Sequence, residues 1–261
     1  MDWRKLGRWL MAAGLVGIGG CCQLHAIAPP DPEWVEPCQV TPLGARNHVY
    51  IFFVHGLDPL NCANLSGVRD YVQGLGFNKT YYGQLYHTAQ FEREMRSIHA
   101  NDPDARFVLI GFSLGANMVR NIAQAVKPDG IGIDLLVYLG GNTLKDAPRD
   151  RPENAARVIN ILAQGCVWNG ATLEGAENVQ VRQVGHFGSP THPYTLQTLA
   201  RELAALAATV PVVPPPEPPL PPGEEAPTPR PLTGSSDGPR DEWDFLKPVP
   251  HLGKRMPPAQ P

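Results

Sequence analysis

Residues 111–115 carry the clearest chemical signal in the sequence. They read Gly-Phe-Ser-Leu-Gly, so that Ser113 stands between two glycines. A serine hydroxyl becomes a nucleophile when a sharp turn exposes it and a neighbouring base can take its proton. The apolar run 106–110 ends directly before this segment, and helical spacing over 114–125 follows it. This order predicts a strand, a tight turn and a helix, with Ser113 as a nucleophile at the end of the strand.

A base is expected later in the chain than the serine. His186, in the string Gly-His-Phe-Gly, comes directly after the strand-like run 179–184. A histidine that follows the last strand of a sheet stands in the order that a serine–histidine pair on an α/β sheet requires. His186 is therefore the predicted general base, with His192 as the reserve candidate.

These residues need a sheet to bring them together, and the sequence alternates accordingly. Runs that are apolar on both faces indicate buried parallel strands, and helical spacing separates them. We expect strands at 49–54, 80–86, 106–110, 134–139, 156–162 and 179–184, and helices at 65–75, 90–100, 114–125 and 195–208. The predicted fold class is α/β: a doubly wound, mostly parallel six-stranded sheet with flanking helices. Chemistry in such a sheet lies at the carboxyl ends of its strands.

The strings VYIFFVHG (49–56), RFVLIGFSLGANMV (106–119) and LEGAENVQVRQVGHFG (173–188) resemble the small, lidless bacterial lipases and esterases of the α/β-hydrolase superfamily. The resemblance extends over most of residues 47–208. It implies a minimal α/β-hydrolase fold without a cap domain, and no metal or organic cofactor. It also implies an oxyanion hole formed by the backbone N–H groups of Leu57 and Leu114, with His55 bracing the first of these loops.

The acid of a catalytic triad is the position at which the sequence departs from that family. The family places its acid after the fifth strand, which here falls near Cys166, where no carboxylate stands. Asp146, after the fourth strand, is the predicted acid, and Glu174 is the alternative. A serine–histidine dyad, with Asn142 or a backbone carbonyl orienting the imidazole, is the third interpretation.

The composition argues against one class of protein and separates a proline-rich C-terminal part from the rest of the chain. Lys plus Arg is 22 and Asp plus Glu is 25, so the net charge of −3 argues against a nucleic-acid binder, which needs a basic face. Of the 29 prolines, 17 fall within 211–261. Proline fixes φ and removes a backbone donor, so this part is expected to be an extended or disordered tail.

The N-terminus resembles an export signal. Basic residues stand within the first eight positions, an apolar run covers 10–20, and Ile-Gly-Gly-Cys at 18–21 is similar to a bacterial lipobox. Attachment to a membrane through a lipid on Cys21 is one interpretation; cleavage after Ala26 and an uncleaved anchor are the others. The protein is accordingly expected to be exported, as a membrane-anchored lipoprotein or as a periplasmic or extracellular protein.

The predicted organisation is a signal at 1–26, a linker at 27–44, a hydrolase domain at 45–210 and a tail at 211–261. A disulfide between Cys38 and Cys62 is an open alternative in an oxidising compartment. The predicted function is hydrolysis of small-molecule or lipid carboxylic esters through an acyl-enzyme on Ser113. A non-catalytic surface module that uses the same fold to bind a ligand or partner is the alternative.

Overall fold

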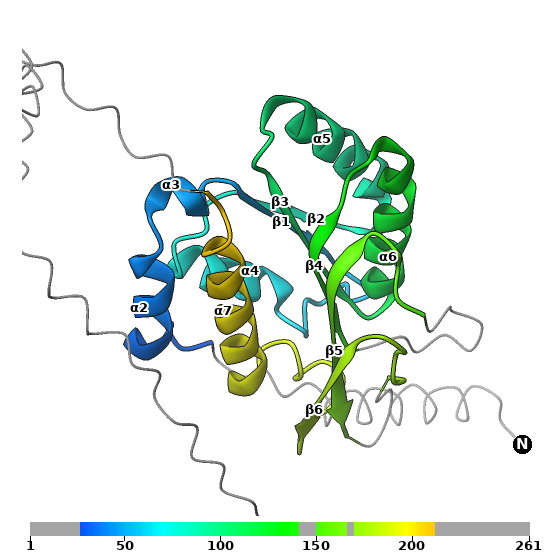
Figure 1. Ribbon diagram of the computed structural model, residues 1–261. Helices are drawn as coiled ribbons and strands as arrows, with labels where there is room; N and C mark the ends of the chain where they lie inside the picture. Colours follow the sequence, from blue (N-terminus) through cyan, green and yellow to red (C-terminus); the bar gives the residue numbers. More distant parts are fainter. Residues whose placement is uncertain (1–26, 141–149, 166–169, 212–261) are drawn as a thin grey trace, which may run out of the picture. The chain divides into compact units, whose positions relative to one another are not determined.

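The computed structural model describes residues 27–140, 150–165 and 170–211. The described residues all belong to one unit, which lies within 1–214. They form one six-stranded sheet, in which every neighbouring pair is parallel and the order is β2-β1-β3-β4-β5-β6 (Figure 1). The strands are β1 (Val49–Val54), β2 (Thr80–Gly83), β3 (Arg106–Phe112), β4 (Ile133–Leu139), β5 (Ala155–Gln164) and β6 (Glu177–Arg182).

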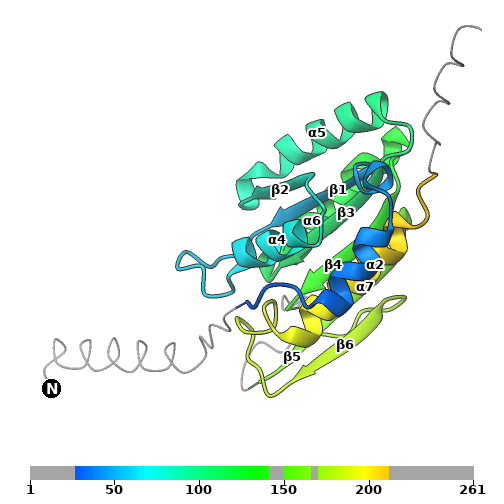
Figure 2. The same cartoon turned by 90° about the vertical axis from the view of Figure 1, so that its left-hand side faces the viewer.

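Helices cover both faces of this sheet (Figures 1 and 2). One layer holds α2 (Pro32–Val40), α4 (Leu65–Gly74) and α7 (Pro193–Ala207), and the other holds α5 (Thr88–Asn101) and α6 (Leu114–Val126). The short helices are α3 (Leu43–Arg46), η1 (Leu85–His87) and η2 (Lys127–Asp129). Strands β1 and β4 are buried along nearly their whole length, as a sheet covered on both faces requires.

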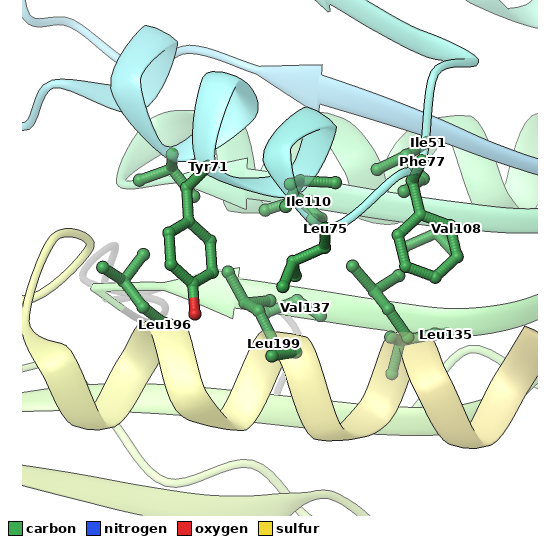
Figure 3. Close-up of a cluster of buried hydrophobic side chains, with 14 of the residues drawn as sticks. Ile51, Tyr71, Leu75, Phe77, Val108, Ile110, Leu135, Val137, Leu196 and Leu199 are labelled. Carbon is green, nitrogen blue, oxygen red and sulfur yellow. The ribbon is translucent and has the colours of Figure 1, made fainter. Parts of the chain in front are cut away.

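Side chains from α4 and α7 fill the space over the centre of the sheet. Figure 3 shows Tyr71 of α4, Leu75 directly after α4, and Leu196 and Leu199 of α7 over strand residues such as Val137. Leu75 and Val137 are fully buried, and the other three are at most 6% exposed. Removing such apolar surface from water is the main stabilising contribution to a layered fold of this kind.

The fold class predicted from the sequence is confirmed, with two differences in the elements. The run predicted as a strand at 80–86 ends at Gly83, and a turn of 3-10 helix follows it. Most of the predicted linker 27–44 is helical instead: it contains α2 and the start of α3. Asp31 caps α2 by accepting the Glu33 N–H at 3.1 Å, and Pro32 occupies its first turn. Helix α2 was not predicted from the sequence, because it contains Pro37 and a proline disfavours the interior of a helix.

Helix α2 packs on α7 and buries Cys38 completely. The Cys38 thiol lies 3.8 Å from the carbonyl oxygen of Ala200 and is not oxidised, so the disulfide with Cys62 is not formed. Burial raises the pKa of this thiol, with a smaller opposing effect from Arg46, and a protonated thiol is unreactive. Cys38 is therefore part of the apolar core.

A polar network closes the amino edge of the sheet, where β1 begins. The Tyr50 hydroxyl donates to Asp102 at 2.8 Å and accepts from the Lys79 ammonium at 2.6 Å. Nδ1 of His48 lies 2.8 Å from the same carboxylate. Burial by itself would raise the pKa of Asp102, but hydrogen bonds from Tyr50 and His48 outweigh burial and lower it.

Because all six strands are parallel, their carboxyl ends share the opposite edge. The chain runs outward from β1 to β2 and then returns to β3 on the other side of β1. The switch point of the sheet therefore lies between β1 and β3, and ligands of open α/β sheets bind beyond the carboxyl ends of the strands at such a point. Within the described residues no cap domain covers this edge. None of the described helices is long and apolar enough to cross a membrane.

Candidate active site

Ser113 occupies a strained turn between β3 and α6. Its backbone has φ 53° and ψ −118°, a region that L-residues seldom adopt. The turn is fixed by two hydrogen bonds: the Ser113 N–H donates to Leu139 at the end of β4 at 2.9 Å, and the Ser113 carbonyl accepts from Ala116 at 3.0 Å. A strained backbone of this kind persists only where the surrounding fold over-determines it, and such strain is concentrated at functional sites. The side chain stays partly exposed.

The two glycines that flank Ser113 are required by close approach of the backbone. A Cβ on Gly111 would lie 2.4 Å from the carbonyl oxygen of Gly115. A Cβ on Gly115 would lie 2.2 Å from the carbonyl oxygen of Val54 in β1. Neither contact is sterically allowed, so the G-x-S-x-G spacing is a packing requirement of a helix that starts directly against two strands.

The loop after β1 lies directly beside the serine turn. A Cβ on Gly56 would meet the carbonyl oxygen of Phe112 at 2.5 Å, Cβ of Ser113 at 2.9 Å and the backbone nitrogen of Leu114 at 3.3 Å. The structure therefore brings the backbone around Leu57 next to that of Leu114, as an oxyanion hole would require. The Leu57 side chain itself is 71% exposed.

Buried polar groups hold this loop in place. His55 is 1% exposed; its Nδ1 lies 3.0 Å from the carbonyl oxygen of Gly56, and its Nε2 lies 3.2 Å from Oδ1 of Asn61. Asp58 accepts the N–H groups of Cys62 at 2.8 Å and Ala63 at 2.7 Å. Both of these polar contacts of His55 lie within its own loop, and its ring also lies against those of Tyr82 and Phe112.

His186 lies at the carboxyl ends of β3 and β4, although it follows β6 in the chain. Its side chain is 4% exposed, and its ring centroid is 4.9 Å from that of Phe112. A Cβ on Gly140 would lie 2.8 Å from Cε1 and 2.9 Å from Nδ1 of His186. Gly140 directly follows Leu139, which accepts the Ser113 N–H, so the imidazole stands over the position next to the serine.

The turn that carries His186 is closed by its own hydrogen bonds. The N–H groups of Gly188 and Ser189 donate to the carbonyl oxygen of Gly185, both at 3.1 Å. The Ser189 hydroxyl donates to the His186 carbonyl at 3.0 Å. His192, the reserve base, accepts the Tyr194 N–H at 3.2 Å and caps α7.

The structure does not identify the carboxylate that would pair with His186. Asp146 and Asn142 lie outside the described residues, as does Cys166. Glu174 is exposed in the turn that precedes β6, at the amino edge of the sheet and opposite to Ser113. Because the strands are parallel, Glu174 before β6 and His186 after it lie at opposite edges of the sheet, an arrangement that does not favour Glu174 as the acid.

The site also depends on two residues that the sequence analysis did not single out. Gly140, with φ +76°, leaves the space that the His186 ring occupies, and Phe112 packs against that ring. Gly140 could have been found from the sequence, because it is a glycine directly after a predicted buried strand. Among the described residues no group of three or more His, Cys, Asp and Glu side chains could hold a metal ion.

No protein-family model matches this chain, and no curated protein matches it. Solved structures do match, at low identity. The RedJ thioesterase from the prodiginine pathway of Streptomyces coelicolor is 10% identical, covers 70% of this chain and 90% of its own, and has a TM-score of 0.40. The esterase domain of a Rhodothermus marinus protein is 14% identical, with 64% and 88% covered and a TM-score of 0.40.

A third matching structure, an arylesterase, is 13% identical, with 62% of this chain and 76% of its own covered and a TM-score of 0.38. The decisive observations lie in this chain: a parallel sheet ordered 2-1-3-4-5-6, and a positive-φ serine between β3 and the helix that follows it. The fold is that of an α/β hydrolase. In this fold, Ser113 occupies the strained turn between β3 and α6, and His186 occupies the turn after the last strand.

Proposed function

We propose that the protein is a serine hydrolase that cleaves carboxylic esters through an acyl-enzyme on Ser113. The observation that carries the proposal is the strained turn at Ser113 with the His186 imidazole over the adjacent Gly140. A fold that needed only a strand-to-helix connection would have no reason to hold a serine at φ 53° beside a buried histidine.

In the proposed mechanism His186 takes the Ser113 proton as Oγ attacks the ester carbonyl. The tetrahedral oxyanion then accepts hydrogen bonds from the backbone N–H groups of Leu57 and Leu114. The close approach of Gly56, in the loop after β1, to the backbone of Leu114 supports this role. When the intermediate collapses, the C–O bond to the alcohol breaks and His186 returns the proton to the leaving oxygen. Water, deprotonated by His186, hydrolyses the acyl-enzyme and restores the serine.

The imidazolium that forms in each half-reaction needs a partner for its second nitrogen. We propose Asp146 for this position, because it follows β4 and so belongs to the loop that leaves the carboxyl edge beside Gly140. In the loops after β1, β2 and β6 that the structure describes, the single Asp or Glu is Asp58, and its oxygens are occupied by backbone amides. If Asp146 is not the acid, the remaining arrangement is a dyad of Ser113 and His186.

We further propose that the protein is exported and held to a membrane by a lipid on Cys21. The basic start, the short apolar run and the string Ile-Gly-Gly-Cys support this proposal. The mass of the mature N-terminal peptide tests it: a diacylglyceryl-modified Cys21 is expected. A mature chain that begins at Ile27 would contradict it.

The hydrolase proposal is tested by labelling the full chain with a fluorophosphonate, which reacts with an activated serine and not with an ordinary one. We expect one adduct, on the peptide that contains Ser113. The adduct should be lost in Ser113→Ala, strongly reduced in His186→Gln and retained in Ser97→Ala, where Ser97 is an exposed serine on α5. Absence of labelling in the folded wild-type chain would refute the proposal and favour the non-catalytic binding module.

A further inference from the structure

The carboxyl edge that holds the proposed site has an unusual surface composition. Six large apolar side chains are exposed among the described residues, and four of them lie on this edge. Leu57 and Leu60 are in the loop after β1, Tyr86 is in the turn after β2, and Tyr194 is at the start of α7. We call these four residues the apolar rim. Leu60 and Tyr86 are each 78% exposed, and it is the gathering of four such side chains at one edge that suggests an interaction site.

The same loops carry almost no charge. Residues 55–64, 84–88 and 183–194 together contain one Asp, Glu, Lys or Arg, whereas such residues make up 18% of the chain. That one residue, Asp58, is 7% exposed and points its carboxylate at backbone amides. These three loops, with one buried charge and with projecting leucine and tyrosine side chains, suit the boundary between water and an apolar phase.

The described chain begins at this edge. Ile27 packs on the first turn of α4, because its Cδ1 lies 2.8 Å from the position of a Cβ on Gly67. Helix α4 starts directly after the loop 55–64, so Ile27 and the rim are neighbours. In Figure 2 the blue start of the chain, the cyan loop after β1 and the yellow turn before α7 lie on one side of the domain.

The length of the chain before Ile27 limits how far the domain can move from an anchor. Ile27 is six positions after Cys21, and six steps of a fully extended chain span about 20 Å. Strand β5 alone has ten residues and is about 33 Å long, so the tether is shorter than the sheet. A lipid on Cys21 would therefore hold the carboxyl edge, rather than the amino edge, close to the bilayer.

We propose that the apolar rim docks on the bilayer that holds the anchor, so that the site opens onto the membrane surface. The occupant is a lipid surface, because the tether joins the rim to one and the rim offers no charge to a polar partner. The rim would add apolar contact with the bilayer to the attachment that the lipid on Cys21 supplies. The proposal rests on the lipid at Cys21 and not on the activity of Ser113.

Docking can be measured without catalysis. The mature, lipidated full chain carrying Ser113→Ala is reconstituted into phosphatidylethanolamine–phosphatidylglycerol vesicles that contain brominated lipid. Leu60→Trp adds a tryptophan on the rim, and Leu43→Trp adds one at the opposite edge, where Leu43 is 56% exposed in α3. We expect the added emission of Leu60→Trp to be quenched and that of Leu43→Trp to persist. Equal quenching of the two, or quenching of neither, would overturn the proposal, as would a mature chain without a lipid on Cys21.

A second measurement follows the consequence for substrate access, with Ser113 intact. The pair Leu60→Asn and Tyr86→Asn should lower the hydrolysis of an ester dissolved in the bilayer by about tenfold, the effect of withdrawing roughly two methylene groups from an apolar phase. It should leave hydrolysis of a short soluble ester unchanged. The matched pair Val40→Asn and Leu43→Asn should change neither rate. A chain that hydrolyses no ester but shows rim-specific quenching would refute the proposed function and support docking.

Discussion

Replacing Ser113 by glycine separates the strain in the turn from the chemistry of the hydroxyl. A residue held at φ 53° and ψ −118° costs about 1–3 kcal/mol, and glycine escapes most of that cost because it has no Cβ. Glycine also loses more backbone entropy on folding, which costs about 0.4–1 kcal/mol relative to alanine. The difference predicts that Ser113→Gly is more stable than Ser113→Ala by about 1 kcal/mol, and neither variant should hydrolyse a p-nitrophenyl ester.

The measurement is thermal and urea unfolding of the two full-length variants. For a domain of this size, 1 kcal/mol corresponds to about 3 °C in the unfolding midpoint. The matched control is Ser97 on α5, where glycine should be less stable than alanine by about 1 kcal/mol because the site is an ordinary exposed helix position. The opposite signs at the two serines are the signature of strain. If Ser113→Gly is less stable than Ser113→Ala, by the amount seen at Ser97, the turn is unstrained and the reasoning from Ser113 to a nucleophile fails.

Three further predictions concern the acid, the amino edge and the tail. Asp146→Asn should lower esterase activity by about 10⁴-fold, as loss of the acid does in a serine protease, while Glu174→Gln should leave it near wild type; the reverse result would remove Asp146 from the mechanism. Because the pKa of Asp102 is lowered in the folded state, the carboxylate stabilises the fold above about pH 4, and this stabilisation is lost as the pH falls through the folded-state pKa. Asp102→Asn should therefore lower the free energy of unfolding in urea by about 1 kcal/mol at pH 7 and by progressively less in acid. A cost that does not change with pH would contradict the carboxylate's role. Deleting 211–261 should leave the unfolding midpoint and the esterase rate nearly unchanged, and a loss of many degrees would show that the tail docks on the domain.

Local patterns determined most of the elements that position the site. Apolar runs long enough for a strand and too short for a helix marked β1, β3 and β4, and each ends within two residues of the predicted bound. The serine turn could also be predicted from the sequence. Gly111 and Gly115 are required by close contacts among β3, α6 and the adjacent β1, and the first two of these elements are neighbours in the sequence. Helix α2 was missed because its stability comes from burying Cys38 against α7, a contact more than 160 residues away in the sequence.

Only the tertiary structure decided which residues share an edge of the sheet. Glu174 is 12 residues from His186 in the sequence, yet β6 lies between them and places them at opposite edges. His186 and Gly140 are 46 residues apart, yet the parallel order of β4, β5 and β6 brings the imidazole onto the glycine. The apolar rim gathers four side chains from three separate loops, and no periodicity in the sequence joins them. Sequence patterns report which neighbours a residue has along one element, whereas proximity at a sheet edge depends on strand order and direction, which long-range burial selects.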